Sequence, residues 1–295
     1  MDGFIVLDKP EGKSSFFIAN RCRKILGARK VGHLGTLDPF ATGLLTIAVN
    51  AGTKAIPYVS INQKCYEFEI KFGEKTDTGD KTGKVIAAVY TIPEYDEVMS
   101  ILPKFLGKIQ QKPHQFSAIK IKGQRAYQIA RKGLNPNIES RSVTIFNLHL
   151  LARITDNIFK LEATVSPGTY VRSLAEDIAT SLRTVGHVIS LRRILDGKFG
   201  LDDAITIDRL EEKKENIEDV LISLEEVLCD IPTYFVSDRE ASDLAFGRSV
   251  AWEAEIESRS GVCLASAKSG KLWIAEVRSA GGVSILAPRR VLIGV

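Results

Sequence analysis

Residues 32–45 read "GHLGTLDPFATGLL", a stretch of glycine, small residues and leucine that holds one carboxylate, Asp38, with a proline directly behind it. Pro39 restricts Asp38 to extended backbone conformations, and the glycines on either side let the main chain turn sharply or approach a ligand closely. Such a loop can present a carboxylate rigidly to a cleft, as a nucleophile or a general base requires. On local pattern alone, a turn opened by Asp-Pro is the favoured interpretation. The choice between a turn and a site therefore depends on the rest of the chain.

The segments on both sides of this loop predict an α+β fold with a mixed, largely antiparallel sheet flanked by helices. Before the loop, residues 4–10 form a short apolar run typical of a buried strand, and Ser14 or Ser15 caps a helix that Gly27 ends. After the loop, residues 64–73 alternate like a strand, and residues 83–90 are its expected hairpin partner. Two more strands then precede a helix, and this mixed order favours the α+β class.

The end of the chain predicts a second, smaller domain. With 295 residues, the chain is longer than a single compact core usually serves. An acidic helical stretch at residues 206–228 leads to Pro232, after which short strands alternate with glycine turns. We therefore divide the chain near residue 231, into a larger domain at residues 1–230 and a small β-rich domain at residues 231–295.

Charge is distributed unevenly along a chain whose formal net charge is only +4. Residues 13–30 carry six Lys or Arg and no acid, and residues 104–153 carry ten against the single acid Glu139. Residues 202–230 hold eleven Asp or Glu against three basic residues. Such segregation suits a polyanionic partner, although charge alone equally fits solvated faces that happen to cluster.

Several common classes of protein lack their marks in this sequence. The N-terminus resembles neither a signal peptide nor a membrane span, so we expect a cytoplasmic protein that does not enter the membrane. The four cysteines and four histidines are scattered without metal-site spacing, so no metal is expected. The Gly12-Lys13 pair lacks the earlier glycine of a phosphate-binding loop, because that position is Leu7. We expect no cofactor.

The whole chain resembles the TruB family of tRNA pseudouridine synthases, the bacterial enzymes that act on uridine 55 of the T arm. The motifs that carry this resemblance occur in the family's order and spacing: "LDKPEGKSS", "GHLGTLDPFATGLL", "KCYEFEIKFGEKTDTGDKTG", "SPGTYVRSLAEDI" and "HVISLRR". They cover about residues 3 to 200. The resemblance implies the pseudouridine synthase fold, a PUA-like C-terminal domain and tRNA as the partner, with no obligate protein partner and a monomeric enzyme.

The resemblance also implies roles for individual residues. Asp38 matches the catalytic aspartate, Tyr66 the tyrosine that packs on the target base, and Arg172 the arginine that pairs with the carboxylate. His33, Tyr170 and Leu191 match positions that line the uridine pocket. The segment near residues 104–141 matches the RNA-gripping insertion, with Lys120, Tyr127 and Arg131 as its RNA contacts. The chain departs from the family pattern at Leu34 and at His114, which replaces part of a proline-rich lead into the insertion.

The isomerisation that the resemblance implies requires one carboxylate and no redox chemistry. Asp38 must be ionised to attack C1′ or to remove a proton from C2′, and the sequence leaves both routes open. A guanidinium within ~4–6 Å favours the charged form of a carboxylate. Taken singly, Tyr66, Arg172 and Leu191 are more simply core or surface residues. A non-catalytic RNA-binding protein, or a synthase with another uridine target or a guide RNA, is the alternative.

Overall fold

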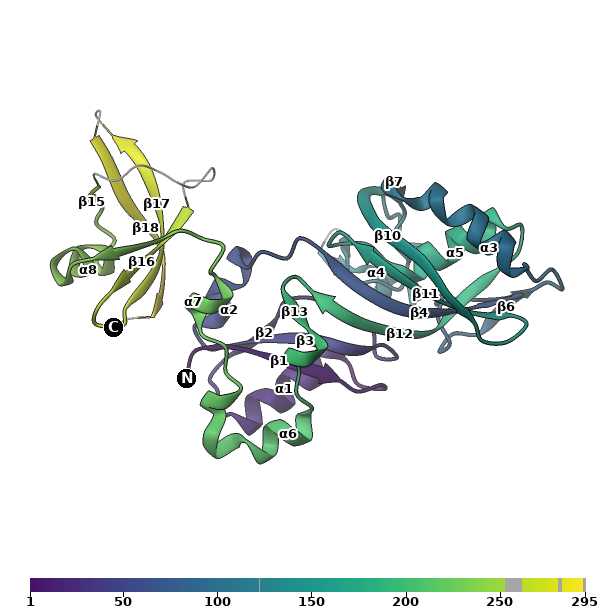
Figure 1. The fold of residues 1–295 in the computed structure, drawn as a ribbon, viewed down its shortest axis with the longest axis horizontal. Helices are drawn as coiled ribbons and strands as arrows, with labels where there is room; N and C mark the ends of the chain where they lie inside the picture. The colour runs from purple at the N-terminus through teal and green to yellow at the C-terminus, as the bar shows by residue number, and fades with distance from the viewer. Residues whose placement is uncertain (122, 253–261, 281–282, 294–295) are drawn as a thin grey trace.

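The computed structural model describes residues 1–121, 123–252, 262–280 and 283–293 (Figure 1). Its main sheet has nine strands in the order β1-β3-β12-β4-β11-β10-β7, with β2 paired to β3 and β13 paired to β12. The strands are Gly3–Lys9 (β1), Val31–His33 (β2), Thr42–Val49 (β3), Lys64–Phe72 (β4), Gly107–Gln111 (β7), Arg141–Arg153 (β10), Ile158–Val165 (β11), Gly186–Asp196 (β12) and Phe199–Gly200 (β13). The expected mixed, largely antiparallel sheet is confirmed, because among the described strands of this sheet only β3 and β12 pair in parallel.

Helices cover the two halves of this sheet separately (Figure 1). The helices are Ser15–Ile25 (α1), Gly52–Ala55 (α2), Tyr95–Ile101 (α3), Ala126–Ala130 (α4), Val171–Ser181 (α5), Ile207–Glu212 (α6) and Leu224–Val227 (α7), with 3-10 turns at Ile56–Tyr58, Leu102–Phe105, Leu201–Asp203 and Lys214–Asp219. Helices α1 and α6 pack on β1 and β3, whereas α3 and α5 pack on β4, β10, β11 and β12. The acidic stretch at 206–228 is thus three short helical pieces.

Strands β3 and β12 pair in parallel inside the sheet, next to the loop that carries Asp38. Gly43 pairs with Arg193, and its φ of +93° lies in the left-handed region that favours glycine. A Cβ at Gly43 would collide with the backbone carbonyl of Arg193. The glycine after the Asp-Pro pair therefore lets two strands approach and brings the motif at 187–193 beside the loop.

The strand at residues 64–73 does not form the hairpin expected from the sequence. Val85–Ala88 (β6) pairs with Glu74–Thr76 (β5), and β4 lies instead between β11 and β12. The apolar side chains of β6 are exposed to solvent and are not packed in the core of the main sheet. The connection between β5 and β6 holds Asp80, whose backbone bridges Val188 of β12.

The C-terminal part forms a second sheet of five strands in the order β14-β16-β17-β18-β15. Its elements are Thr233–Val236 (β14), Asp238–Ala245 (α8), Val250–Ala251 (β15), Val262–Ala267 (β16), Leu272–Ala280 (β17) and Val283–Ile293 (β18). Leu272, Ile274 and Leu292 from this sheet share an apolar cluster with Phe4 and Leu44 of the main sheet. The division near residue 231 and the PUA-like character of this sheet stay predictions.

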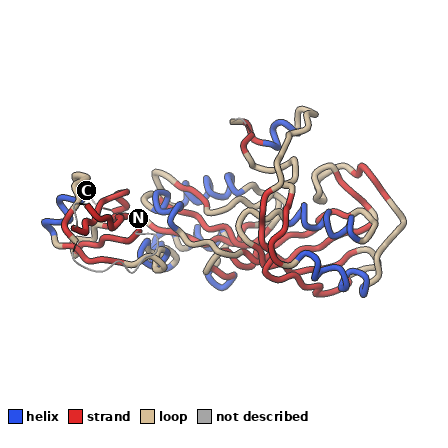
Figure 2. Tube along the Cα trace, turned by 90° about the horizontal axis from the view of Figure 1, so that it is seen from above, coloured by secondary structure: helices blue, strands red, loops and turns tan. Residues whose placement is uncertain are grey.

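The insertion after β7 projects from the body of the protein, as Figure 2 shows for the segment around α4. It carries a small hairpin of Lys120–Ile121 (β8) and Gln124–Arg125 (β9), which leads into α4. Within the described ranges, no helix is both long and apolar enough to cross a membrane.

Candidate active site

The loop that carries Asp38 is fixed from behind by buried polar groups. The Ser15 hydroxyl accepts a hydrogen bond from the Leu37 amide at 2.8 Å and donates to the Leu37 carbonyl at 2.9 Å. On the other side of Asp38, the Pro39 carbonyl accepts from the Lys9 ammonium at 3.2 Å. Both neighbours of the carboxylate are therefore anchored, so Asp38 stands on a rigid support.

Arg172 reaches Asp38 as the sequence predicts. Its Nε lies 2.9 Å from Asp38 Oδ2, and its side chain is almost fully buried at the second residue of α5. The remaining guanidinium nitrogens are also engaged: Nη1 donates to the Thr78 carbonyl at 2.8 Å and lies 3.3 Å from Asp80 Oδ2, and Nη2 donates to the Phe116 carbonyl at 3.0 Å. Three further groups thus fix the plane of the guanidinium that faces Asp38.

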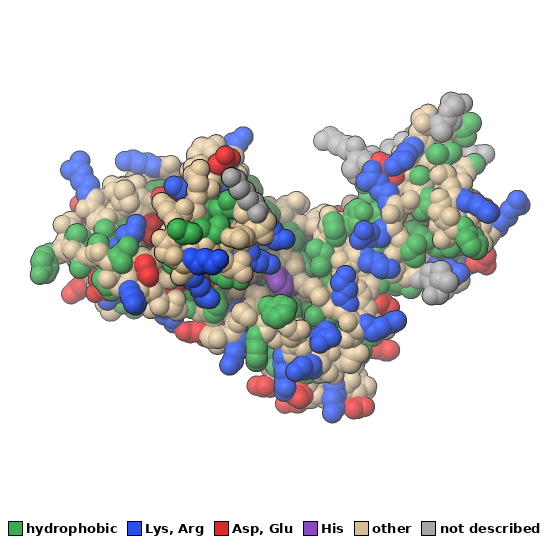
Figure 3. All heavy atoms as spheres, turned by 180° about the vertical axis from the view of Figure 1, so that it is seen from behind, with side chains coloured by type: hydrophobic (Ala, Val, Ile, Leu, Met, Phe, Trp, Pro, Cys, Tyr) green, Lys and Arg blue, Asp and Glu red, His purple; other side chains and the backbone are tan. Residues whose placement is uncertain are grey.

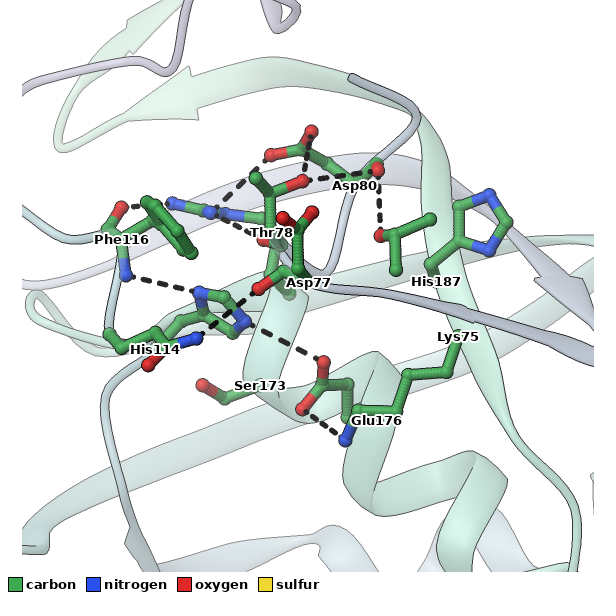
Figure 4. Close-up of polar contacts among 12 residues, drawn as sticks. Lys75, Asp77, Thr78, Asp80, His114, Phe116, Ser173, Glu176 and His187 are labelled. Atoms are coloured by element: carbon green, nitrogen blue, oxygen red, sulfur yellow. Dashed lines mark hydrogen bonds and ion pairs between the residues drawn. The ribbon is translucent and has the colours of Figure 1, made fainter. Parts of the chain in front are cut away.

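Asp80 is a site residue that the sequence reasoning did not single out. It is buried, and its Oδ1 accepts from the Thr78 hydroxyl at 2.9 Å, the Thr82 amide at 2.9 Å and the Thr82 hydroxyl at 2.5 Å, as Figure 4 shows in part. The pattern "TDTGDKT" around it was the available signal, because hydroxyl residues two positions either side of an aspartate are typical of a local side-chain network. Asp80 holds Arg172 from the side opposite to Asp38.

The pKa of Asp38 lies above its ordinary value of 3.8, because burial disfavours the charged carboxylate and Asp80 adds repulsion. Arg172 and His114 act in the opposite direction. We expected Arg172 to keep the carboxylate charged, and its contribution has that sign, but burial outweighs it. The side chain is nevertheless 33% exposed, so solvent and substrate can reach it.

A pocket of about 490 Å³ opens above Asp38 and brings together side chains from distant parts of the chain. Five of the predicted residues line it: Asp38, Tyr66, Tyr170, Arg172 and Leu191. Tyr66 comes from β4 and Leu191 from the neighbouring β12, so their positions follow from the strand pairing. A volume of this size is sufficient for a nucleoside.

Lys64, Arg193 and Asp196 form a buried ionic group under the same pocket, and the sequence reasoning did not assign them. Asp196 lies 3.0 Å from Lys64 Nζ and 3.3 Å from Arg193 Nη2, and both basic side chains line the pocket. Burial raises the pKa of the Tyr66 phenol, and Arg193 opposes this shift. Burial and Arg193 also lower the pKa of Lys64. Two cations share one carboxylate, which leaves a positive charge facing the pocket.

The other predicted residues lie outside this pocket. His33 directly precedes the lining residues Leu34 and Gly35 but is not one of them. Burial, together with Arg193, lowers the pKa of the His33 imidazole. Lys120 follows the lining segment 117–119, and Tyr127 and Arg131 border a separate surface cavity on α4. The structure does not bring these three residues of the insertion to Asp38.

Basic side chains line the pocket and lie along one face of the protein: Arg141 joins Lys64, Arg172 and Arg193 in the pocket wall. Figure 3 shows Lys and Arg along the hollow in the middle of one face of the protein. In the part of the chain that the structure describes, no three His, Cys, Asp or Glu side chains are grouped as a metal site would need. The arrangement provides one carboxylate, an anchored guanidinium and an aromatic wall.

Comparison with known proteins assigns this arrangement to a family. The model of the TruB family pseudouridylate synthase N-terminal domain matches residues 23–171, and the tRNA pseudouridylate synthase B C-terminal domain matches residues 172–229. The chain belongs to the TruB family of pseudouridine synthases. The expected family and fold class are therefore confirmed. The enzyme isomerises uridine to pseudouridine, which is the reaction of this family.

Relatives of this TruB-family chain cover nearly its whole length. A protein of Ruegeria pomeroyi named tRNA pseudouridine synthase B is 39% identical over 291 residues, which are 94% of this chain and 95% of the relative. A protein of Gluconacetobacter diazotrophicus with the same name is 42% identical over 255 residues, 85% of this chain and 83% of the relative. The crystal structure of a Cbf5-Nop10-Gar1 complex contains a chain with the same fold, with a TM-score of 0.72 at 21% identity over 99% of this chain and 85% of that chain.

Proposed function

We propose that this enzyme converts the uridine at position 55 in the T loop of tRNA into pseudouridine, with Asp38 as its catalytic residue. The observation that carries the proposal is the Asp38 carboxylate in the pocket, held 2.9 Å from Arg172. The relatives named tRNA pseudouridine synthase B support tRNA as the substrate. We further propose that the enzyme works in the cytoplasm as a monomer without an obligate protein partner.

In the proposed reaction, the pocket holds the target base after it has left its stack in the RNA. A uridine in a folded loop must be turned out of its stack, at a cost of about a few kcal/mol, and Tyr66 offers an aromatic face that receives it. The N1–C1′ bond then breaks, the base turns, and a C5–C1′ bond forms while C5 loses a proton and N1 gains one. Tyr170 and Leu191 complete the walls that retain the detached base.

Asp38 acts on the ribose in this scheme. It either attacks C1′ as a nucleophile or removes the C2′ proton as a base, and both routes require an ionised carboxylate. Arg172 supports the ionised form and fixes its direction by charge-assisted hydrogen bonding. The cations Lys64 and Arg193 place positive charge near the base while its glycosidic bond is broken.

An unmodified tRNA transcript tests the proposed function directly. We expect one pseudouridine, in the T loop, after incubation with the protein and mapping by chemical labelling and primer extension. A transcript with cytidine at that position is the matched control and should show no product. Modification at several positions, or none in the T loop, would contradict the proposed target.

The insertion should contribute to tRNA affinity through charge. We expect Lys120→Ala and Arg131→Ala each to weaken tRNA binding severalfold and to reduce the slope of log affinity against log salt by about one. The measurement is filter binding over a range of salt concentrations. Lys213→Ala, which removes a lysine paired with Asp219 in the acidic stretch, is the control and should not change the slope. A wild-type affinity that does not depend on salt would contradict a phosphate-gripping surface.

A further inference from the structure

His114 lies behind the active site, at the start of the insertion, and belongs to no part of the pocket described above. It is buried, with 9% of its surface exposed, and borders a second cavity of about 330 Å³, which Ser173 and Glu176 of α5 also line. A buried histidine needs partners for both ring nitrogens. Those partners connect it to the catalytic pair.

The two ring nitrogens of His114 face different groups, as Figure 4 shows. Nδ1 accepts a hydrogen bond from the Phe116 amide at 3.3 Å, and Nε2 lies 3.6 Å from Glu176 Oε1. Because Nδ1 is an acceptor, the neutral ring carries its proton on Nε2, toward the carboxylate. The ring also stacks on Phe116, with an interplanar angle of 24°.

Phe116 links this histidine to Arg172. Its amide is held by His114, and its carbonyl accepts from Arg172 Nη2 at 3.0 Å. The chain just before His114 is anchored separately, because Ser173 donates to the Lys112 carbonyl at 3.0 Å. His114 and Gln115, whose Nε2 donates to the Asp77 carbonyl at 3.4 Å, therefore fix the next residues of the backbone, where the insertion contacts the guanidinium.

We propose that His114, oriented by Glu176, is a positioning residue that sets the place of Arg172 against Asp38 through the backbone of Phe116. The proposal rests on the proposed function of the Asp38 pocket. It assigns no contact with RNA to His114. Its consequence is that loss of the Nδ1 acceptor slows the chemical step and leaves tRNA affinity nearly unchanged.

The pair formed by His114 and Glu176 lies among other charged side chains. Lys75, Asp77 and Lys112 line the same cavity as His114 and Glu176. His114 and Lys75 hold the pKa of Glu176 below its ordinary value, although burial alone would raise it. The Glu176 carboxylate therefore keeps its negative charge opposite the Nε2 proton of His114.

Two substitutions at position 114 separate positioning from packing. His114→Ala removes the acceptor, and we expect a single-turnover rate about five- to tenfold lower with tRNA affinity within about twofold of the wild type. His114→Asn restores an acceptor, because an asparagine oxygen bonds the amide two residues on, and should recover a rate within about twofold of the wild type.

Other results would overturn the positioning role. An unchanged rate with weakened tRNA binding in His114→Ala would assign the residue to the RNA grip, and an asparagine variant as slow as the alanine variant would remove the role of the acceptor. The ¹⁵N shifts of the imidazole test the tautomer without any substrate, and a proton on Nδ1 would contradict the proposal. If wild-type enzyme made no pseudouridine, the proposed function would fail, whereas the ¹⁵N result would still decide the state of His114.

Discussion

Replacing Asp38 by asparagine should lower the rate of pseudouridine formation by at least about 10³-fold, because an amide can neither attack C1′ nor remove a proton from C2′. The shape of the side chain is preserved, so the base pocket and the RNA-binding surface should remain. The measurement is single-turnover conversion of a tRNA transcript with enzyme in excess. Affinity for tRNA, measured by filter binding, should stay within a fewfold of the wild type.

The folded state should tolerate this substitution. Burial raises the pKa of Asp38, so its contribution to stability is present below the unfolded pKa and is lost as pH rises through the folded pKa. The ionised carboxylate therefore costs folding free energy, and its removal should not lower the melting temperature. Arg172 keeps Asp80 as a partner, at 3.3 Å.

A matched control uses the same chemical change away from the pocket. Asp243→Asn, in helix α8 of the C-terminal part, breaks an ion pair with Arg248 and should leave the rate unchanged. An Asp38→Asn enzyme with near-normal turnover would remove Asp38 from the mechanism. A variant that failed to bind tRNA would instead show that the substitution disturbs the pocket.

The elements that were predictable from the sequence are those whose pattern is local. Helix α1 begins where Ser14 caps it, with the Ser14 hydroxyl accepting from the Phe17 amide at 3.1 Å. The strand at 64–72 follows from alternation, since every second side chain along most of it is buried. Its pairing was wrong, because strand partners depend on contacts far along the chain, and alternation alone does not choose between them.

The residues of the candidate site were also predictable only in part. Asp38 and Arg172 are 134 positions apart in the sequence, and only the ordered family motifs indicated that they meet. Asp80, Lys64 and Arg193 lay within those motifs but were not chosen, because a charged residue in a polar turn or strand more often faces solvent. Their burial decides their role, and burial depends on the tertiary fold.

Replacing Arg172 by lysine should have the second-largest effect, a fall of about 10²-fold in the single-turnover rate. A lysine keeps the charge but has one ammonium group, which cannot reach Asp38, Asp80 and the Thr78 and Phe116 carbonyls together. Asp38 would then lose part of the attraction that opposes its burial, so its pKa should rise further. Because the reaction needs the ionised carboxylate, the acid limb of the pH–rate profile should move to higher pH.

The pH profile separates this mechanism from a general loss of structure. In the wild type, the limb attributed to Asp38 should already lie above the ordinary aspartate value of 3.8, and Arg172→Lys should displace it upward while tRNA affinity changes little. Arg153→Lys is the matched control, because Arg153 pairs with Glu94 at 2.8 Å and does not line the pocket. A rate within about threefold of the wild type with an unmoved limb would show that Asp38 does not depend on the guanidinium. A lower rate with an unmoved limb would mean that Arg172 orients the carboxylate without controlling its charge, since charge and geometry are the two properties by which it acts on Asp38.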